Sequence, residues 1–159
     1  MAFPKGFLFG TANADHQVEA HDPGREDVWD LWERCQGLTP RGRATAWLSM
    51  GGRHAQLVGF KCLDLFRSFG ILSAGDPESE TSTPEFMNDT AINTKVDYLL
   101  VGLGTHENQP TNRSVVFHQI LEKHGVVHDY AVGGNGAHDW ATWRWLLHER
   151  LLPNLFKRK

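Results

Sequence analysis

Short apolar runs alternate with amphipathic stretches along the chain from residue 44 onward. Each apolar run is five or six residues long, as buried strands usually are, and a stretch with helical spacing follows each of them. Strands that alternate with helices predict right-handed crossovers and a parallel sheet, so we expect an α/β half-sheet of about four strands with flanking helices. The expected strands are 44–48, 69–73, 98–102 and 127–132, and the expected helices are 51–62, 84–93, 113–123 and 140–151.

Residues up to about 46 follow a different pattern. Aromatic residues open the chain at Phe3, Phe7 and Phe9, and residues 28–32 have helical spacing. The glycines, proline and arginines of residues 37–43 are typical of a loop. We therefore expect two segments, 1–46 and 47–159.

The composition narrows the class of protein. Of the 159 residues, 40% are hydrophobic and 22% are charged, which is typical of a globular chain with room for one ordinary domain. The formal net charge of -3, with acids and bases interspersed, argues against a nucleic-acid partner. No apolar stretch approaches the ~20 residues that span a bilayer, so we expect no membrane partner. No basic and then apolar leader opens the chain, so we expect a cytoplasmic protein.

A candidate nucleophile, Ser49, follows the first expected strand. The run Leu-Ser-Met-Gly-Gly at 48–52 joins this strand to a helix, which is the setting of a nucleophile elbow, where the serine lies on a tight, strained turn. The usual pattern is Gly-x-Ser-x-Gly. Gly51 fills the second glycine position, whereas Trp47 occupies the first. We expect an indole at this position to strain the packing of the turn.

A candidate base, His138, lies after the last expected strand. The glycine-rich loop 133–137 ends in this histidine at the start of a helix. A general base must lie on a loop that can reach the nucleophile, and this loop meets that condition. Asp139 is expected to cap the helix by accepting a backbone N–H.

A candidate acid, Glu107, follows the third expected strand. The residue that orients the histidine of an α/β-hydrolase comes from a loop at the carboxyl end of a strand, between nucleophile and base in chain order. Glu107 meets both conditions. The order Ser49, Glu107, His138 is that of the α/β-hydrolases and differs from the orders of other serine hydrolases.

Together these motifs give residues 47–159 a specific resemblance. The elbow at 48–52, the strand 69–74, the loop 103–105 and above all the run Gly-Ala-His-Asp-Trp at 136–140 resemble the C-terminal half of esterase D-like and feruloyl-esterase-type carbohydrate esterases. The resemblance implies a truncated α/β-hydrolase fold with three layers. It also implies a serine esterase without a cofactor, acting on short acyl or hydroxycinnamoyl esters, either small molecules or linked to plant polysaccharides. Carried over by position, Ser49 is the nucleophile, His138 is the base, and Glu107 stands where the family usually has aspartate.

The same resemblance has consequences for the oxyanion hole and for assembly. It assigns one oxyanion N–H to Met50, directly after the nucleophile. The family's early strands have no counterpart here, and the loop that donates the second N–H is missing with them. Because the missing strands would leave an exposed sheet edge, we expect a homo-oligomer.

Residues 3–46 resemble a different family. The runs 3–12 and 16–19 resemble the opening of family-one β-glycosidases, in which Gln17 stands at the position of a sugar-binding glutamine. This implies a chimera of two enzyme fragments. The family's two catalytic glutamates have no counterpart, although retaining glycosidases need two carboxyl groups ~5–5.5 Å apart. Two alternatives to the esterase stay open: a glycosidase-type activity of the N-terminal fragment and a catalytically silent fusion.

The histidines, cysteines and tryptophans change this picture little. The nine histidines show no metal-binding spacing, so we expect no metal site. Cys35 and Cys62 also lack a zinc spacing and are expected to be free thiols. Trp140 and Trp143 lie three residues apart on an expected helix, which favours packing over a sugar-binding platform.

Overall fold

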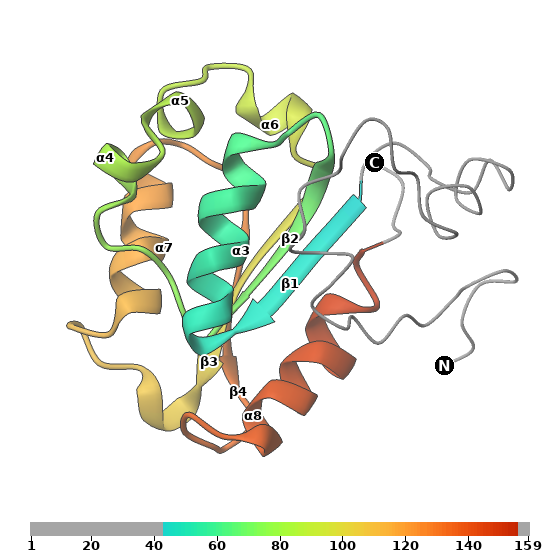
Figure 1. The fold of residues 1–159 in the computed structure, drawn as a ribbon. Coiled ribbons are helices and arrows are strands. Elements are labelled where there is room, and N and C mark those ends of the chain that lie inside the picture. Colours follow the sequence, from blue (N-terminus) through green and yellow to red (C-terminus); the bar gives the residue numbers. More distant parts are fainter. Residues whose placement is uncertain (1–42, 156–159) are drawn as a thin grey trace, which may run out of the picture. The chain divides into compact units, whose positions relative to one another are not determined.

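Four parallel strands form a sheet in the order β1-β2-β3-β4 (Figure 1). The structure is a computed structural model and describes residues 43–155. Strands that follow one another in the chain are neighbours in the sheet and pair in parallel, so a crossover joins each pair. The expected α/β half-sheet is thereby confirmed. The strands are β1 (Arg43–Leu48), β2 (Phe66–Leu72), β3 (Tyr98–Gly104) and β4 (Asp129–Gly133).

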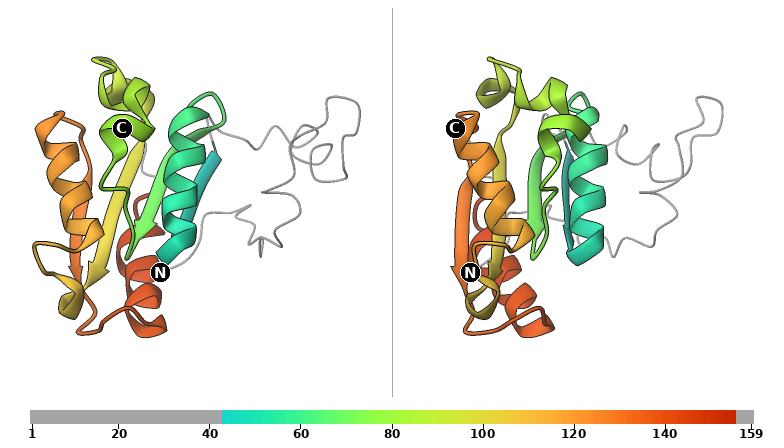
Figure 2. Two further views of the ribbon diagram at one scale, coloured as in Figure 1. Left: turned by 60° about the vertical axis from the view of Figure 1, so that its left-hand side comes forward. Right: turned by 90° about the vertical axis from the view of Figure 1, so that its left-hand side faces the viewer.

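Helices cover both faces of the sheet and make three layers (Figures 1 and 2). On one face, Phe60 of α3 and Phe117 of α7 pack in a cluster with Phe69 of β2. On the other face, Leu146, at the start of the π-helical turn η2 that continues α8, packs on the strands. The helical elements are α3 (Ser49–Lys61), α4 (Ser79–Ser82), α5 (Pro84–Met87), α6 (Ile92–Lys95), η1 (Thr105–Glu107), α7 (Arg113–Lys123), α8 (Trp140–Trp145) and η2 (Leu146–Leu151).

Strand residues alternate between the two clusters because successive side chains of a strand point to opposite faces. In β3, Leu99 and Val101 belong to the cluster beneath α3 and α7, whereas Leu100 belongs to the cluster beneath η2. None of the three is more than 1% exposed. Burial on both faces explains why this strand is a continuous apolar run in the sequence.

The prediction of one helix over 84–93 is wrong, because two short helices, α5 and α6, take its place. α5 begins at Pro84, and the chain leaves the helical path after Met87. The carboxylate of Asp89 then accepts the N–H of Ala91 at 2.9 Å. Such a local side-chain hydrogen bond offers the backbone an alternative to the helix and ends it.

The boundaries of all four strands differ from expectation by one to three residues: β2 runs over 66–72 in place of 69–73, and β3 ends at Gly104 in place of 102. β4 begins at Asp129 and not at 127, since the N–H of Val127 donates to the side-chain oxygen of Asn93 at 2.8 Å. β1 begins at Arg43, so it runs across the expected segment boundary between residues 46 and 47. The boundary itself stays a prediction.

Other predictions concern residues 1–42, which lie outside the described part of the chain: the glycosidase-like opening, Gln17 and Cys35. Cys62 carries a free thiol. Among residues 43–155, no helix is long and apolar enough to cross a membrane, and no group of three potential metal ligands is assembled. The expected homo-oligomer and the expected location stay predictions.

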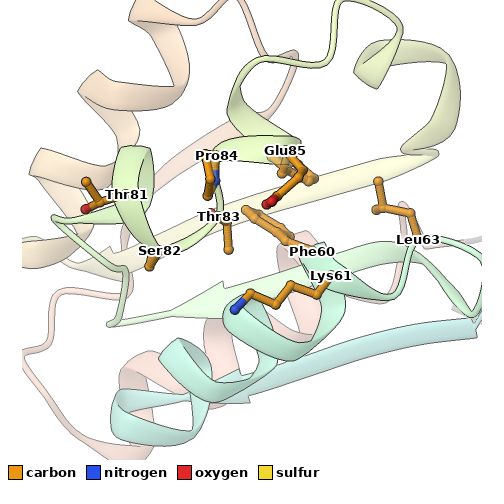
Figure 3. A pocket seen from close by; sticks show the side chains of 9 residues that line it. Phe60, Lys61, Leu63, Thr81, Ser82, Thr83, Pro84 and Glu85 are labelled. Atoms are coloured by element: carbon orange, nitrogen blue, oxygen red, sulfur yellow. The ribbon is translucent and has the colours of Figure 1, made fainter.

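An aromatic contact holds α5 against α3. The ring of Phe60 stacks on that of Phe86 with centroids 3.6 Å apart and meets Phe69 edge-on at 5.2 Å. Beside these rings lies an open pocket of about 610 Å³ (Figure 3). It lies at the C-terminal end of α3, and at 1.5 Å per residue the helix separates it from Ser49 by roughly 17 Å. The lining residues are Phe60, Lys61, Leu63, Thr81, Ser82, Thr83, Pro84, Glu85 and Phe86.

Candidate active site

Ser49 lies at the junction of β1 and α3, at the edge of the sheet where the parallel strands end (Figure 1). Its φ of +54° is in the left-handed region, which residues other than glycine rarely adopt. Backbone strain of this kind persists only where the surrounding structure holds it. A strained strand-to-helix turn that carries a serine is the geometry of a nucleophile elbow.

Two glycines after Ser49 make room for this turn. A Cβ on Gly52 would lie 2.6 Å from the Cβ of Ala74 and 2.9 Å from the carbonyl oxygen of Trp47, so the close approach of α3 to the sheet requires glycine. A Cβ on Gly51 would lie 3.2 Å from the indole of Trp47. The indole that was expected to strain the turn therefore lies beside a glycine, and it is 40% exposed.

His138 reaches Ser49 from the loop after β4. Its Nε2 lies 2.7 Å from Oγ of Ser49, although 89 residues separate the two in the chain. Asp139 caps α8 as expected, since its carboxylate accepts the N–H groups of Thr142 at 2.9 Å and Ala137 at 3.1 Å. These hydrogen bonds, first of all the one from Thr142, lower the pKa of Asp139. They fix the loop on both sides of His138.

Glu107 lies on η1, the short turn after β3, and is only 7% exposed. Its Oε1 lies 2.8 Å from Nδ1 of His138. Its Oε2 accepts the hydroxyl of Ser73 at 2.6 Å and the N–H of Gly104 at 3.0 Å. The side chain thus turns back toward its own strand. This path takes up the extra length of glutamate relative to aspartate.

Glu107, His138 and Ser49 form one continuous line of hydrogen bonds. Because an ionised carboxylate only accepts, the proton between Glu107 and His138 is assigned to Nδ1. The Nε2 of a neutral ring then carries a lone pair, and this lone pair faces the serine hydroxyl. Such a ring can remove the hydroxyl proton while the carboxylate stabilises the resulting imidazolium. The three predicted residues therefore lie together, and their catalytic roles stay predictions.

Two further side chains join this line, and the sequence analysis assigned neither of them to the site. The indole N–H of Trp143 donates to Oγ of Ser73 at 3.0 Å, and Ser73 follows β2. The Trp143 ring also meets the ring of His138 edge-on, with centroids 5.1 Å apart. The sequence did offer one signal for Ser73, because this residue directly follows an expected strand. The carboxyl ends of neighbouring parallel strands lie together at one end of the sheet, where the other site residues also lie.

Two large apolar side chains are exposed beside the line. Met50 is 72% exposed and Trp140 is 67% exposed. The ring of Trp140 meets that of Trp143 edge-on at 5.3 Å. The expected packing of the two rings is therefore present, although Trp140 keeps most of its surface exposed. Trp140 is the first residue of α8, which begins beyond the end of the strands, so the sheet does not cover it.

The loops that carry Glu107 and His138 touch at Gly104. A Cβ on Gly104 would lie 2.5 Å from the carbonyl oxygen of Gly136 and 2.8 Å from that of Ala137. The N–H of His106 donates to the carbonyl of Gly136 at 2.9 Å and ties the same two loops together. The distance between Glu107 and His138 therefore depends on residue 104 having no Cβ.

If Ser49, His138 and Glu107 act as one catalytic unit, Gly104→Ala should push the two loops apart and lower kcat about 10- to 100-fold, because small displacements of reacting groups cost this much. The φ of Gly104 is −71°, which alanine adopts readily, so the effect would be steric. The control is Gly125→Ala, where φ is +65° and an added Cβ meets nothing within 4 Å. This control should lower Tm slightly and leave kcat unchanged. Parent-like kcat in Gly104→Ala would contradict the prediction.

Two comparisons with known proteins found similar chains that are named as esterases. The chain is similar in sequence to an endo-1,4-beta-xylanase/feruloyl esterase from Xylanibacter ruminicola, with 35% identity over 116 residues, or 72% of this chain. The chain spans only 14% of the length of that protein. No protein-family model matches the chain.

In fold, the chain is similar to a solved ferulic acid esterase. The TM-score is 0.57 and the identity 23%, over 79% of this chain and 56% of the other. The structural likeness supports the α/β fold, and the sequence likeness supports the esterase part of the resemblance described above. The glycosidase-like opening and the chimera stay predictions.

Proposed function

We propose that this chain is a serine esterase in which Ser49 is the nucleophile, His138 the general base and Glu107 the residue that orients the base. The observation that carries the proposal is the line of hydrogen bonds, 2.8 Å from Glu107 to His138 and 2.7 Å from His138 to Ser49. The positive φ of Ser49 supports it, because strained backbone concentrates at functional sites. The similar xylanase/feruloyl esterase carries an esterase activity in its name.

In the first half-reaction, Nε2 of His138 takes the hydroxyl proton of Ser49 as Oγ bonds to the carbonyl carbon of the ester. Glu107 stabilises the imidazolium through Nδ1. When the tetrahedral intermediate collapses, His138 gives the proton to the leaving alcohol, and the acyl group stays on Ser49. In the second half-reaction, water gives a proton to His138 and attacks the acyl group. Ser49 then leaves with that proton, and the carboxylic acid is released.

The charge that develops on the carbonyl oxygen requires N–H donors. We assign one of them to Met50, directly after the nucleophile in the first turn of α3. A helix N-terminus also carries partial positive charge, which favours an oxyanion. No acidic residue lies in the first turn of α3 to oppose this effect.

The proposed substrates are short acyl or hydroxycinnamoyl esters, including those linked to plant polysaccharides. The feruloyl group in the names of the similar enzymes motivates this class. The side chain of His138 is 48% exposed, so an alcohol attached to a polymer need not enter an enclosed cavity. Trp140 presents an aromatic surface beside the base, on which the ring of a hydroxycinnamoyl group can stack.

If Trp140 stacks on the acyl group, Trp140→Ala should raise KM for a hydroxycinnamoyl ester about 3- to 10-fold, since aromatic contacts contribute this much to binding. The value of kcat/KM for an acetyl ester should stay unchanged, because that acyl group has no ring. Leu147→Ala is the control, since Leu147 is also large and 42% exposed. Equal losses on both esters would show that Trp140 does not select the acyl group.

The test of the proposed esterase is the intact mass of the chain after incubation with a fluorophosphonate probe. We expect one adduct on the parent and on Ser114→Ala, and none on Ser49→Ala, with circular dichroism showing all three folded. Ser114 is a suitable control because it is a fully buried serine on α7, outside the line of hydrogen bonds. No adduct on folded parent would favour the silent alternative. Aryl-β-glycoside hydrolysis that survives Ser49→Ala would favour the glycosidase alternative.

A further inference from the structure

We propose that Ser73 and Trp143 are positioning residues that hold the carboxylate of Glu107 toward His138. The inference rests on the proposed esterase function and extends the site from three side chains to five. Ser73 is 9% exposed and follows β2, whereas Trp143 lies on α8. Segments that follow β2, β3 and β4 therefore meet at one carboxylate.

Hydrogen-bond chemistry fixes the direction of this network. An indole N–H can only donate, so Oγ of Ser73 accepts from Trp143 at 3.0 Å. The ionised carboxylate of Glu107 can only accept, so the hydroxyl proton of Ser73 points to Oε2 at 2.6 Å. Each donor strengthens the next in such a chain. The direction runs from Trp143 through Ser73 to Glu107, which in turn pairs with His138.

The network also determines which oxygen of Glu107 meets the base. Oε2 is taken by Ser73 and by the N–H of Gly104 at 3.0 Å, so Oε1 remains for Nδ1 of His138 at 2.8 Å. A glutamate has one more rotatable bond than the aspartate that usually fills this role. The two donors on Oε2 restrict that additional freedom. The proposed roles thus explain how a longer acid can still be aligned with the base.

Trp143 has a second contact that serves the same end. Its ring meets the ring of His138 edge-on, with centroids 5.1 Å apart. One side chain therefore touches the base directly and reaches the acid through Ser73. A displacement of α8 would disturb both partners of the acid–base pair together.

A purely conformational role for Ser73 is the alternative. Its φ is +48°, so the residue could matter only because it turns the chain after β2. Glycine adopts this conformation more readily than serine or alanine. Ser73→Gly therefore keeps the turn and removes the hydroxyl, which separates the two roles.

The experiment compares Ser73→Ala, Ser73→Gly and Trp143→Phe in the parent and in Glu107→Gln, with p-nitrophenyl acetate as the probe ester. In the parent, we expect each change to lower kcat about 10- to 100-fold with KM within about twofold, since it affects alignment and not binding. In Glu107→Gln, the same changes should alter kcat less than about twofold, because residues that act as one unit are not additive. Ser114→Ala, which removes another buried serine hydroxyl, should leave kcat unchanged.

Parent-like kcat in Ser73→Gly, or an equal loss in Glu107→Gln, would overturn the proposed positioning role. A second measurement tests the positioning role even if the parent chain hydrolyses no ester. The Nδ1 proton between His138 and Glu107 should give a low-field resonance in the proton NMR spectrum, absent from His138→Ala. We expect Ser73→Ala to shift or broaden it, and an unchanged resonance would overturn the proposal whether or not the chain is an esterase.

Discussion

Ser49→Ala is expected to lower kcat for ester hydrolysis by at least about 10⁴-fold, because the change removes the atom that carries the acyl group. Within residues 43–155, the hydroxyl that lies against Nε2 of His138 is that of Ser49, at 2.7 Å. The fold should survive, since alanine keeps the backbone and the side chain is small. Steady-state kinetics with p-nitrophenyl acetate, beside a thermal melt, measure both effects.

His138→Ala should cost about as much as Ser49→Ala, and the double variant should be no slower than either single one. Residues of such a unit are strongly non-additive, because the nucleophile is weak without its base and the base has no role without its nucleophile. Losses that multiply in the double variant would mean that the two side chains act independently. A Ser49→Ala variant that keeps a tenth of the parent rate would point to another nucleophile.

Glu107→Gln is expected to lower kcat about 10³- to 10⁴-fold while the protein stays folded. The two donors on Oε2, from Ser73 and Gly104, would hold the amide oxygen of the glutamine on their side. The amide NH₂ would then face Nδ1 of His138 and donate to it. A neutral ring would have to carry its proton on Nε2, opposite the serine, and could no longer accept the hydroxyl proton.

The matched variant for this test is Glu107→Asp, which keeps the charge and shortens the side chain. We expect a smaller loss of about 10-fold, because the shorter acid cannot reach Nδ1 and both donors of Oε2 at once. A pre-steady-state burst would show whether acyl transfer to Ser49 is the slowed step. Parent-like rates in Glu107→Gln would mean that Glu107 has only a structural role.

The positions of the three candidate site residues could be predicted from the sequence, because each of them lies in a short local pattern. The strand-turn-helix pattern around Ser49 and the glycine loop before His138 are short motifs. The acid could be placed because Glu107 directly follows an apolar run. Asp139 could be assigned as a cap for the same reason, since a capping bond spans only three residues, here to Thr142.

The rest of the site depends on contacts between distant parts of the chain. Ser73 is 34 residues from Glu107 and 70 residues from Trp143, so no periodicity connects them. The exposure of Trp140 depends on where α8 begins relative to the end of the strands, which spacing alone does not show. The helix expected at 84–93 failed for a local reason, the hydrogen bond at Asp89, which competes with helical propensity.

The half-exposed ring of His138 has a consequence for what happens to an acyl group once it is attached to Ser49. In the proposed mechanism the ring would activate whichever hydroxyl compound reaches it, and about half of the ring is open to solvent. Water prevails in dilute solution because it is in great excess. In an alcohol-rich medium the same intermediate would pass its acyl group to the alcohol and yield a new ester. The partition between hydrolysis and acyl transfer is then set by the solvent and not by the fold.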